Sequence, residues 1–204
     1  MSSRDRILAT IKNNQPGQRD LPSLTPPGDG HEADLSKQFV DVLEAIGGRA
    51  YIVSGWDRIA TILKEEYTQN HRLVSGCPQL SSMAEVTARY EDPHSLENVD
   101  LAVLEAHFGV AENGACWITE DRMIERALPF IAQHLALVIH KRDIVAHMHQ
   151  AYEVIADKNY GFGTFIAGPS KTADIEQSLV LGAHGPRSMT VFLVDEELSD
   201  AGFY

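Results

Sequence analysis

Short apolar runs alternate with segments of helical periodicity from residue 34 onward, and this alternation constrains the fold more than any other feature. Apolar residues recur at helical spacing up to the Gly47-Gly48 pair: Leu35, Phe39, Val42, Leu43 and Ile46. The β-branched run "RAYIVS" follows, and "HRLVS", "LALVIH" and "MTVFLVD" repeat the strand pattern further along the chain. Strands that alternate with helices in this way predict an α/β fold with a mainly parallel sheet.

The remaining segments complete this prediction. We expect helices at 56–69, 123–134 and 141–158, the last with an apolar face that includes Ile144 and Val145. Residues 101–110 and 114–119 are predicted to be two strands joined by the turn "AENG", because Asn-Gly between apolar runs favours a chain reversal. This pair is the antiparallel hairpin of the fold, and "GTFIAG" at 163–168 is a further strand.

The first 30 residues differ from the rest of the chain. Ile7, Leu8 and Ile11 indicate a short amphipathic helix, and "QPGQRDLPSLTPPGDG" then packs four prolines and three glycines into a stretch that cannot hold regular structure. We therefore divide the chain into an N-terminal helix and arm, 1–30, and a body, 31–204. The N-terminus does not resemble a signal peptide and no apolar run predicts a membrane span, so we expect a cytoplasmic protein.

The composition excludes several function classes. A formal charge of −12 argues against general nucleic-acid binding, which depends on clustered Lys and Arg. Cys77 and Cys116 are too few to hold an iron-sulfur cluster, and we expect free thiols. His147 and His149 are two residues apart on a predicted helix and point to nearly opposite sides, so we predict no metal site.

The stretch "FIAGPSKTADIEQSLVLGAHGP", residues 165–186, has glycine and proline residues near both ends. It predicts a helix that begins after Gly168-Pro169-Ser170, with Ser170 or Thr172 as cap and a glycine-rich end at His184. In open α/β sheets ligands bind where strands lead into helix N-termini, so the free amides there could hold an anion. The alternative is a well-capped helix whose glycines serve only packing.

The same stretch resembles the signature of the LutC/YkgG family, the lactate utilisation protein C group that carries a LUD domain; the resembling residues are "GPSKTADIEQSLVLGAHGP". Upstream, "GVAENGACWIT" is similar to the family's Gly-hydrophobic-Ala-Glu-Thr-Gly loop, although Asn113 and Ala115 replace expected threonines. The resemblance covers the body from about residue 34. It implies a NagB/RpiA/CoA-transferase-like fold, which is a Rossmann-like α/β sheet with an antiparallel insertion.

The resemblance also implies a function and a site. The chain would be one component of a system that oxidises L-lactate to pyruvate, with no cofactor of its own and with iron-sulfur clusters in partner subunits. The site would be a crevice for a small carboxylate or phosphorylated ligand, with Glu112 or Asp174 as the proton-handling acid. The expected ligand-binding residues are Asn113, Gly114, Gly168, Pro169, Ser170, Lys171, Thr172, Glu176 and His184.

Two alternatives stay open at this stage. "VAENGA" also resembles the Ser-Glu-Asn-Gly signature of CoA-transferases, in which case Glu112 would attack an acyl-CoA thioester and form a covalent intermediate. The chain could instead be a regulatory or scaffold subunit that retains an ancestral ligand crevice but catalyses no reaction. The oligomeric state also stays open, with a homo-oligomer among the alternatives.

Overall fold

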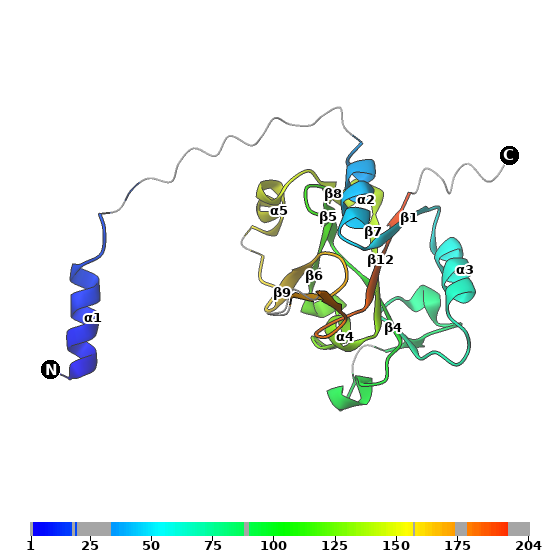
Figure 1. Cartoon of the computed structure of the whole chain (residues 1–204), viewed down its shortest axis with the longest axis horizontal. Helices are drawn as coiled ribbons and strands as arrows, with labels where there is room; N and C mark the ends of the chain where they lie inside the picture. The colour runs from blue at the N-terminus through cyan, green and yellow to red at the C-terminus, as the bar shows by residue number, and fades with distance from the viewer. Residues whose placement is uncertain are drawn as a thin grey trace.

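The protein is built on a six-stranded parallel sheet (Figure 1). The computed structural model describes residues 2–17, 19, 34–87, 90–156, 158–173 and 179–195. The strand order is β1-β12-β7-β4-β2-β3, and every neighbouring pair is parallel. The strands are β1 (Arg49–Val53), β2 (Leu73–Ser75), β3 (Glu85–Val86), β4 (Leu101–Glu105), β7 (His134–His140) and β12 (Ser188–Val194). The predicted α/β class with a mainly parallel sheet is confirmed.

Both faces of this sheet are buried, and successive side chains along a strand enter different cores. In β4, Leu101 and Val103 face one core while Ala102 and Leu104 face the other. This is the two-residue alternation of a β-strand, and burial on both faces explains why the strands read as continuous apolar runs in the sequence.

The described residues include five α-helices. They are α1 (Ser3–Asn13), α2 (Leu35–Ala45), α3 (Trp56–Glu66), α4 (Leu128–Ile131) and α5 (Met148–Ile155). Short 3₁₀ turns lie at Pro78–Leu80, Pro93–Leu96, Glu120–Arg122 and Lys141–Asp143. Helix α3 packs Ile59 and Leu63 on one face of the large sheet, and α2 packs Phe39 and Leu43 into the core on the other face.

A second, four-stranded sheet covers the α2 side of the large sheet. Its order is β8-β5-β6-β9, with β5 (Phe108–Val110), β6 (Ala115–Thr119), β8 (Ile144–Val145) and β9 (Gly163–Ile166). The β5–β6 pair is the predicted hairpin and is antiparallel. Cys116 and Ile118 point into the main core, whereas Phe108 and Trp117 pack against α5 on the outer side. The small sheet is therefore a layer between the large sheet and α5.

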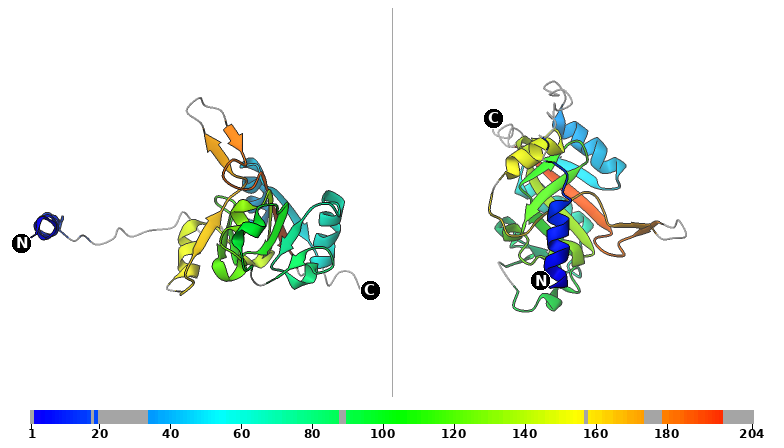
Figure 2. Two further views of the ribbon diagram at one scale, coloured as in Figure 1. Left: turned by 90° about the horizontal axis from the view of Figure 1, so that it is seen from below. Right: turned by 90° about the vertical axis from the view of Figure 1, so that its left-hand side faces the viewer.

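The helix predicted within 165–186 is wrong. Lys171–Ala173 (β10) pairs antiparallel with Leu179–Leu181 (β11), and this two-stranded sheet projects from the body in Figure 2 (orange, left view). Gly168-Pro169-Ser170 fits a helix start, but the same residue types also favour turns. The apolar "LVL" run suits a strand, and the predicted acids Asp174 and Glu176 lie outside the described residues.

Three other boundaries differ from the sequence-based expectations. The strand expected over 101–110 is broken at Ala106-His107, so that β4 and β5 belong to different sheets. The helix expected over 141–158 is limited to α5, because Ile144 and Val145 pair with β5 as β8. The helix expected over 123–134 is only the four residues of α4. In each case tertiary pairing or packing overrides local periodicity.

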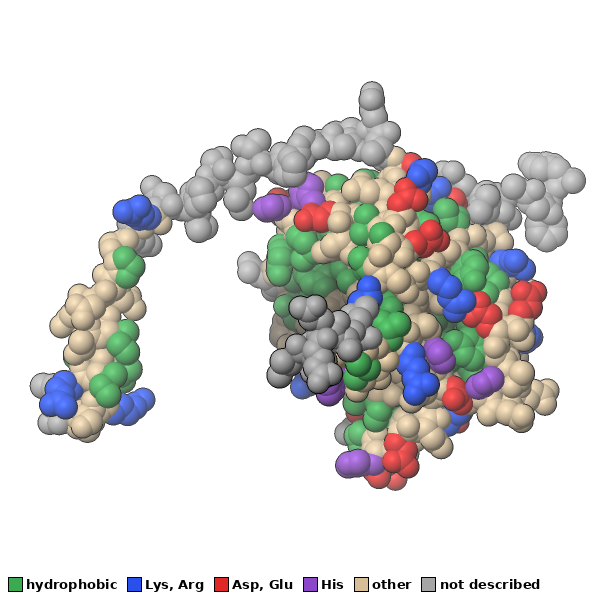
Figure 3. Space-filling model, in the orientation of Figure 1, with side chains coloured by type: hydrophobic (Ala, Val, Ile, Leu, Met, Phe, Trp, Pro, Cys, Tyr) green, Lys and Arg blue, Asp and Glu red, His purple; other side chains and the backbone are tan. Residues whose placement is uncertain are grey.

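The N-terminal helix α1 is present as predicted but contacts no core. A capping box formed by Ser2 and Asp5 begins the helix, and it contains no buried residue. Its apolar side chains Ile7, Leu8 and Ile11 are about half exposed, with Lys and Arg beside them in Figure 3. No helix in the described part of the chain is long and apolar enough to span a membrane.

These contacts predict that stability resides in the body alone. Replacing the fully buried Phe39 with Ala should lower the free energy of unfolding by about 3–5 kcal/mol, through lost burial and a residual cavity. Replacing Ile7, Leu8 and Ile11 together with Ser should change it by less than about 0.5 kcal/mol, as expected of exposed positions. Urea unfolding of both variants checks this. A triple variant as unstable as Phe39→Ala would show that α1 packs on the body.

Candidate functional site

The structure brings the two predicted site segments to one end of the small sheet. Strands β6 and β9 pair antiparallel with Cys116 opposite Ile166, so Gly114 and Gly168 both lie just beyond this end. Both glycines have positive φ, +67° and +69°. Each packs against α2: an added Cβ at Gly114 would lie 3.0 Å from Leu43 Cα, and one at Gly168 3.1 Å from the Ile46 carbonyl oxygen. Helix α2 thus fills the space beside both segments.

The charged side chains at this end are engaged in helix capping. The amide of Met148, the first residue of α5, donates to Glu112 Oε2 at 2.9 Å. A carboxylate there is stabilised by the helix dipole. Lys171 Nζ donates to the carbonyl of Ile46, the C-cap residue of α2. Glu112 and Lys171, which the sequence assigned to one ligand, therefore bind the ends of two different helices.

The other predicted residues at this end have mixed environments. Asn113 Oδ1 accepts from the Ala115 amide at 3.1 Å and shapes the turn. The Ser170 amide donates to the Pro186 carbonyl, and the Ser170 carbonyl accepts from the Gly182 amide. Pro169 is buried, Thr172 pairs with Val180 in the projecting hairpin, and His184 is exposed. Whether any of them binds a ligand stays a prediction.

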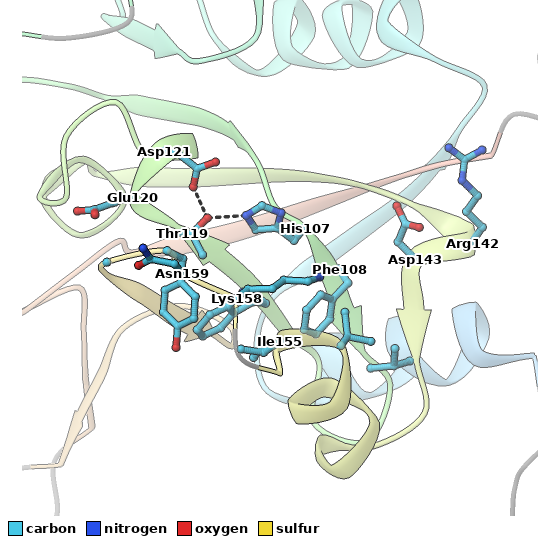
Figure 4. Close-up of a pocket in the computed structure, with 15 residues that line it drawn as sticks. His107, Phe108, Thr119, Glu120, Asp121, Arg142, Asp143, Ile155, Lys158 and Asn159 are labelled. Carbon is cyan, nitrogen blue, oxygen red and sulfur yellow. Dashed lines mark hydrogen bonds between the residues drawn. The ribbon is translucent and has the colours of Figure 1, made fainter.

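A cavity of about 940 Å³ lies at the opposite end of the small sheet, beside the end of β6 and the start of β5 (Figure 4). Helix α5 and the segment after it form the other wall. The lining residues are His107, Phe108, Trp117, Thr119, Glu120, Asp121, Arg142, Asp143, Val145, Val154, Ile155, Lys158, Asn159, Tyr160 and Gly161. A concave, largely apolar space with a few polar groups is the usual form of a small-molecule site.

Three of the lining side chains form a hydrogen-bonded series (Figure 4). The Thr119 hydroxyl donates to Asp121 Oδ1, and His107 Nε2 lies 2.5 Å from Thr119 Oγ1. Because the single hydroxyl proton goes to Asp121, Thr119 can only accept from His107, which places the imidazole proton on Nε2. Nδ1 then carries a lone pair and can accept a hydrogen bond, and His107 lines the cavity.

The electrostatics of the cavity favour a neutral imidazole. Burial lowers the pKa of His107, and the positive charges of Arg122 and Lys158 lower it further, against the opposing effect of Asp121. The hydrogen bond from Thr119 lowers the pKa of Asp121, so its carboxylate stays ionised. His107 is therefore an unprotonated base near neutral pH, held in one tautomer by Thr119 and Asp121.

This cavity and its histidine were not predicted from the sequence. The available signal was weak: Thr119 ends an apolar strand, Asp121 lies two residues further on, and His107 interrupts the run that precedes the Asn-Gly turn. His107 and Lys158 are far apart in the sequence, and only the pairing of β5 with β6 and the packing of α5 bring them to one cavity.

The described residues offer few ligands for a metal ion or an iron-sulfur cluster. Among them, no three His, Cys, Asp or Glu side chains are grouped as metal ligands. Cys77 and Cys116 are both buried and free. Burial raises the pKa of the Cys77 thiol to about 11, and it raises that of Cys116 as well, so neither is placed as a thiolate ligand.

Removal of a negative or a positive charge near His107 should shift the pKa of His107 in opposite directions. Asp121→Asn removes a negative charge and should lower the pKa of His107 further, whereas Lys158→Ala removes a positive charge and should raise it. The exposed Lys64 on α3 supplies the control variant Lys64→Ala, which should leave it unchanged. An NMR titration of the His107 Cε1 proton, assigned with His107→Gln, checks this. Shifts of the same sign in the two cavity variants would contradict the described arrangement.

Comparisons with known proteins agree with the fold. A crystal structure of a DUF162 family protein from Deinococcus radiodurans superposes with a TM-score of 0.59 over 79% of this chain and 96% of that one, at 18% identity. Lactate utilization protein C of Anoxybacillus flavithermus is 25% identical over 167 residues, which is 81% of this chain and 72% of the relative. Its counterpart from Bacillus pumilus is 31% identical over 116 residues, 54% of this chain and 48% of the relative.

The chain is also similar to YkgG of Escherichia coli, with 23% identity over 171 residues that cover 81% of this chain and 71% of that protein. The family model described as the LUD domain matches residues 78–194, more than half of the chain. This span includes the strands of the small sheet and the cavity residues from His107 to Gly161. The chain therefore belongs to the LUD domain family.

Proposed function

We propose that the chain is a component of an L-lactate utilisation system and that the cavity beside His107 is its small-molecule site. Support for the role comes from the LUD domain match and from relatives named lactate utilization protein C. Support for the site comes from one observation: the His107–Thr119–Asp121 series opens onto a cavity of about 940 Å³.

His107 acts as the proton acceptor in this proposal. Its neutral imidazole offers Nδ1 to a hydroxyl or similar donor on a bound ligand, and general bases of this kind act through direct hydrogen bonds. Thr119 and Asp121 are positioning residues, because they fix the tautomer and stabilise the imidazolium after proton transfer. Oxidation of a 2-hydroxy acid to a 2-oxo acid releases protons as well as electrons, so a base is one of the groups such a system requires.

The electron carriers belong to other subunits in this proposal. Both cysteines of the chain are buried thiols with raised pKa values, and a four-ligand iron-sulfur cluster needs more thiolates than the chain has. Iron-sulfur subunits are the partners that fit this requirement.

The projecting hairpin gives such partners a contact surface. Strands β10 and β11 pair with each other alone among the described strands, and an isolated two-stranded sheet is marginally stable in water. Val180 and Leu181 on β11 are 45% and 52% exposed. Burial of these side chains against another protein would stabilise the hairpin.

Growth of a strain that lacks this gene tests the proposed function. The strain should fail on L-lactate as sole carbon source and grow normally on pyruvate, and the wild-type chain should restore growth. His107→Gln should restore little or none, since loss of a general base typically costs 10²–10⁴-fold in rate. His94, whose side chain is 94% exposed, supplies the matched control His94→Gln, which should restore growth fully.

The same assay separates the alternatives. Growth restored by His107→Gln would contradict a catalytic cavity and favour a scaffold subunit. Loss of growth with Glu112→Gln but not with His107→Gln would move the chemistry to the turn at residues 111–114, where the transferase interpretation places it. Circular dichroism and thermal unfolding of each purified variant establish that the fold is retained, which matters for Glu112 because its carboxylate caps α5.

A further inference from the structure

The size of the cavity indicates a ligand larger than lactate. Ligand sites of roughly 300–1,000 Å³ hold molecules of drug or cofactor size, and about 940 Å³ lies at the upper end of this range. Lactate or pyruvate would fill a small part of it. The cysteine count argues against an iron-sulfur cluster, but it does not bear on an organic ligand.

The wall of the cavity is suited to a flat ring. Phe108 and Trp117 are 5% and 8% exposed, and Tyr160 meets Trp117 edge-on, with ring centroids 5.4 Å apart and an interplanar angle of 89°. Ile155 and Val145 extend the apolar surface. Aromatic pairs in stacked or edge-to-face contact are stabilised beyond their area burial, so an aromatic lining favours an aromatic ligand over an aliphatic chain.

The polar groups that line the cavity favour a ligand ring that carries a hydrogen-bond donor. His107 Nδ1 is an acceptor because Nε2 carries the proton that bonds Thr119, so the complementary ligand group is an O–H or N–H. The carboxylates nearby are already engaged: Glu120 pairs with Arg126, and Asp121 accepts from Thr119. Asp143 and Arg142 lie together away from the Thr119 end in Figure 4.

Lys158 adds a positive charge close to the base. Its charge is near enough to His107 to act on the imidazole, and no described residue forms an ion pair with its ammonium group. The side chain extends into the cavity in Figure 4. An anion formed by proton transfer to His107 would be stabilised by this charge.

From these observations we infer that the cavity binds an aromatic ring that carries a phenolic hydroxyl, and that His107 takes the proton of this hydroxyl. Phenols and hydroquinones are the chemical class. The inference rests on the proposed function only in taking this cavity as the ligand site.

The proton step balances without an oxidant. The O–H bond of the ring hydroxyl breaks and an N–H bond forms at His107 Nδ1, which leaves an imidazolium and a phenolate. The phenolate lies near the Lys158 ammonium, and the imidazolium is held through Thr119 by the Asp121 carboxylate. Reprotonation of the phenolate reverses the step.

A fluorescent phenol tests the inference directly. The probe is 4-methylumbelliferone, a two-ring phenol whose phenolate is excited at a longer wavelength than the phenol. At fixed pH near neutrality, excess wild-type chain should raise the phenolate fraction saturably, by about twofold or more. His107→Gln should abolish this rise, and Lys158→Ala should reduce it. Lys64→Ala and His94→Gln, at exposed positions outside the cavity lining, should behave as wild type.

The methyl ether of the probe, 7-methoxy-4-methylcoumarin, separates proton acceptance from simple apolar binding. The ether has no hydroxyl proton to give, so the wild type should bind it more weakly than the phenol. His107→Gln should bind the ether and the phenol equally well. Equal binding of phenol and ether by the wild type, or no saturable phenolate signal, would overturn the inference. That result would leave the growth assay unaffected, whereas a phenolate signal together with growth restored by His107→Gln would contradict the proposed function instead.

Discussion

Burial of the six-stranded parallel sheet on both faces is the constraint on which the rest of the structure depends. Parallel sheets need cover on each side, and α3 supplies it on one side only. On the other side the cover is α2 together with the small sheet, whose inner residues Cys116 and Ile118 complete the main core. The small sheet must in turn be covered on its outer face, which is the role of α5.

This layering makes the two ends of the small sheet different. At the Gly114 end, α2 lies close against the backbone, and the ends of α2 and α5 engage Lys171 and Glu112. At the Thr119 end the sheet diverges from α5 and the segment after it, and the cavity lies between them. The fold therefore places polar side chains at both ends but leaves a large lined space at the second. Chemistry that needs a bound ligand has room beside His107.

The sequence predicted the strands that are buried on both sides, because uninterrupted apolar runs such as "LALVIH" and "MTVFLVD" suit few other structures. It also placed Gly114 and Gly168 in one neighbourhood correctly. It failed where local signals have two meanings: Gly-Pro-Ser at 168–170 fits a helix start and a turn equally, and only pairing of β10 with β11 decides. The cavity could not be predicted from spacing, because His107, Thr119 and Lys158 meet only through the pairing of β5 with β6 and the packing of α5.

The proposed function requires ligand chemistry at the Thr119 end of the small sheet and not at the Gly114 end. The most direct measurement is the change in backbone amide NMR shifts of the uniformly ¹⁵N-labelled chain on titration with 4-methylumbelliferone. If the ligand binds beside His107, the saturable shifts should concentrate at Thr119, Lys158 and Gly161. Shifts concentrated at Gly114 and Gly168, with the Thr119 end unaffected, would contradict it.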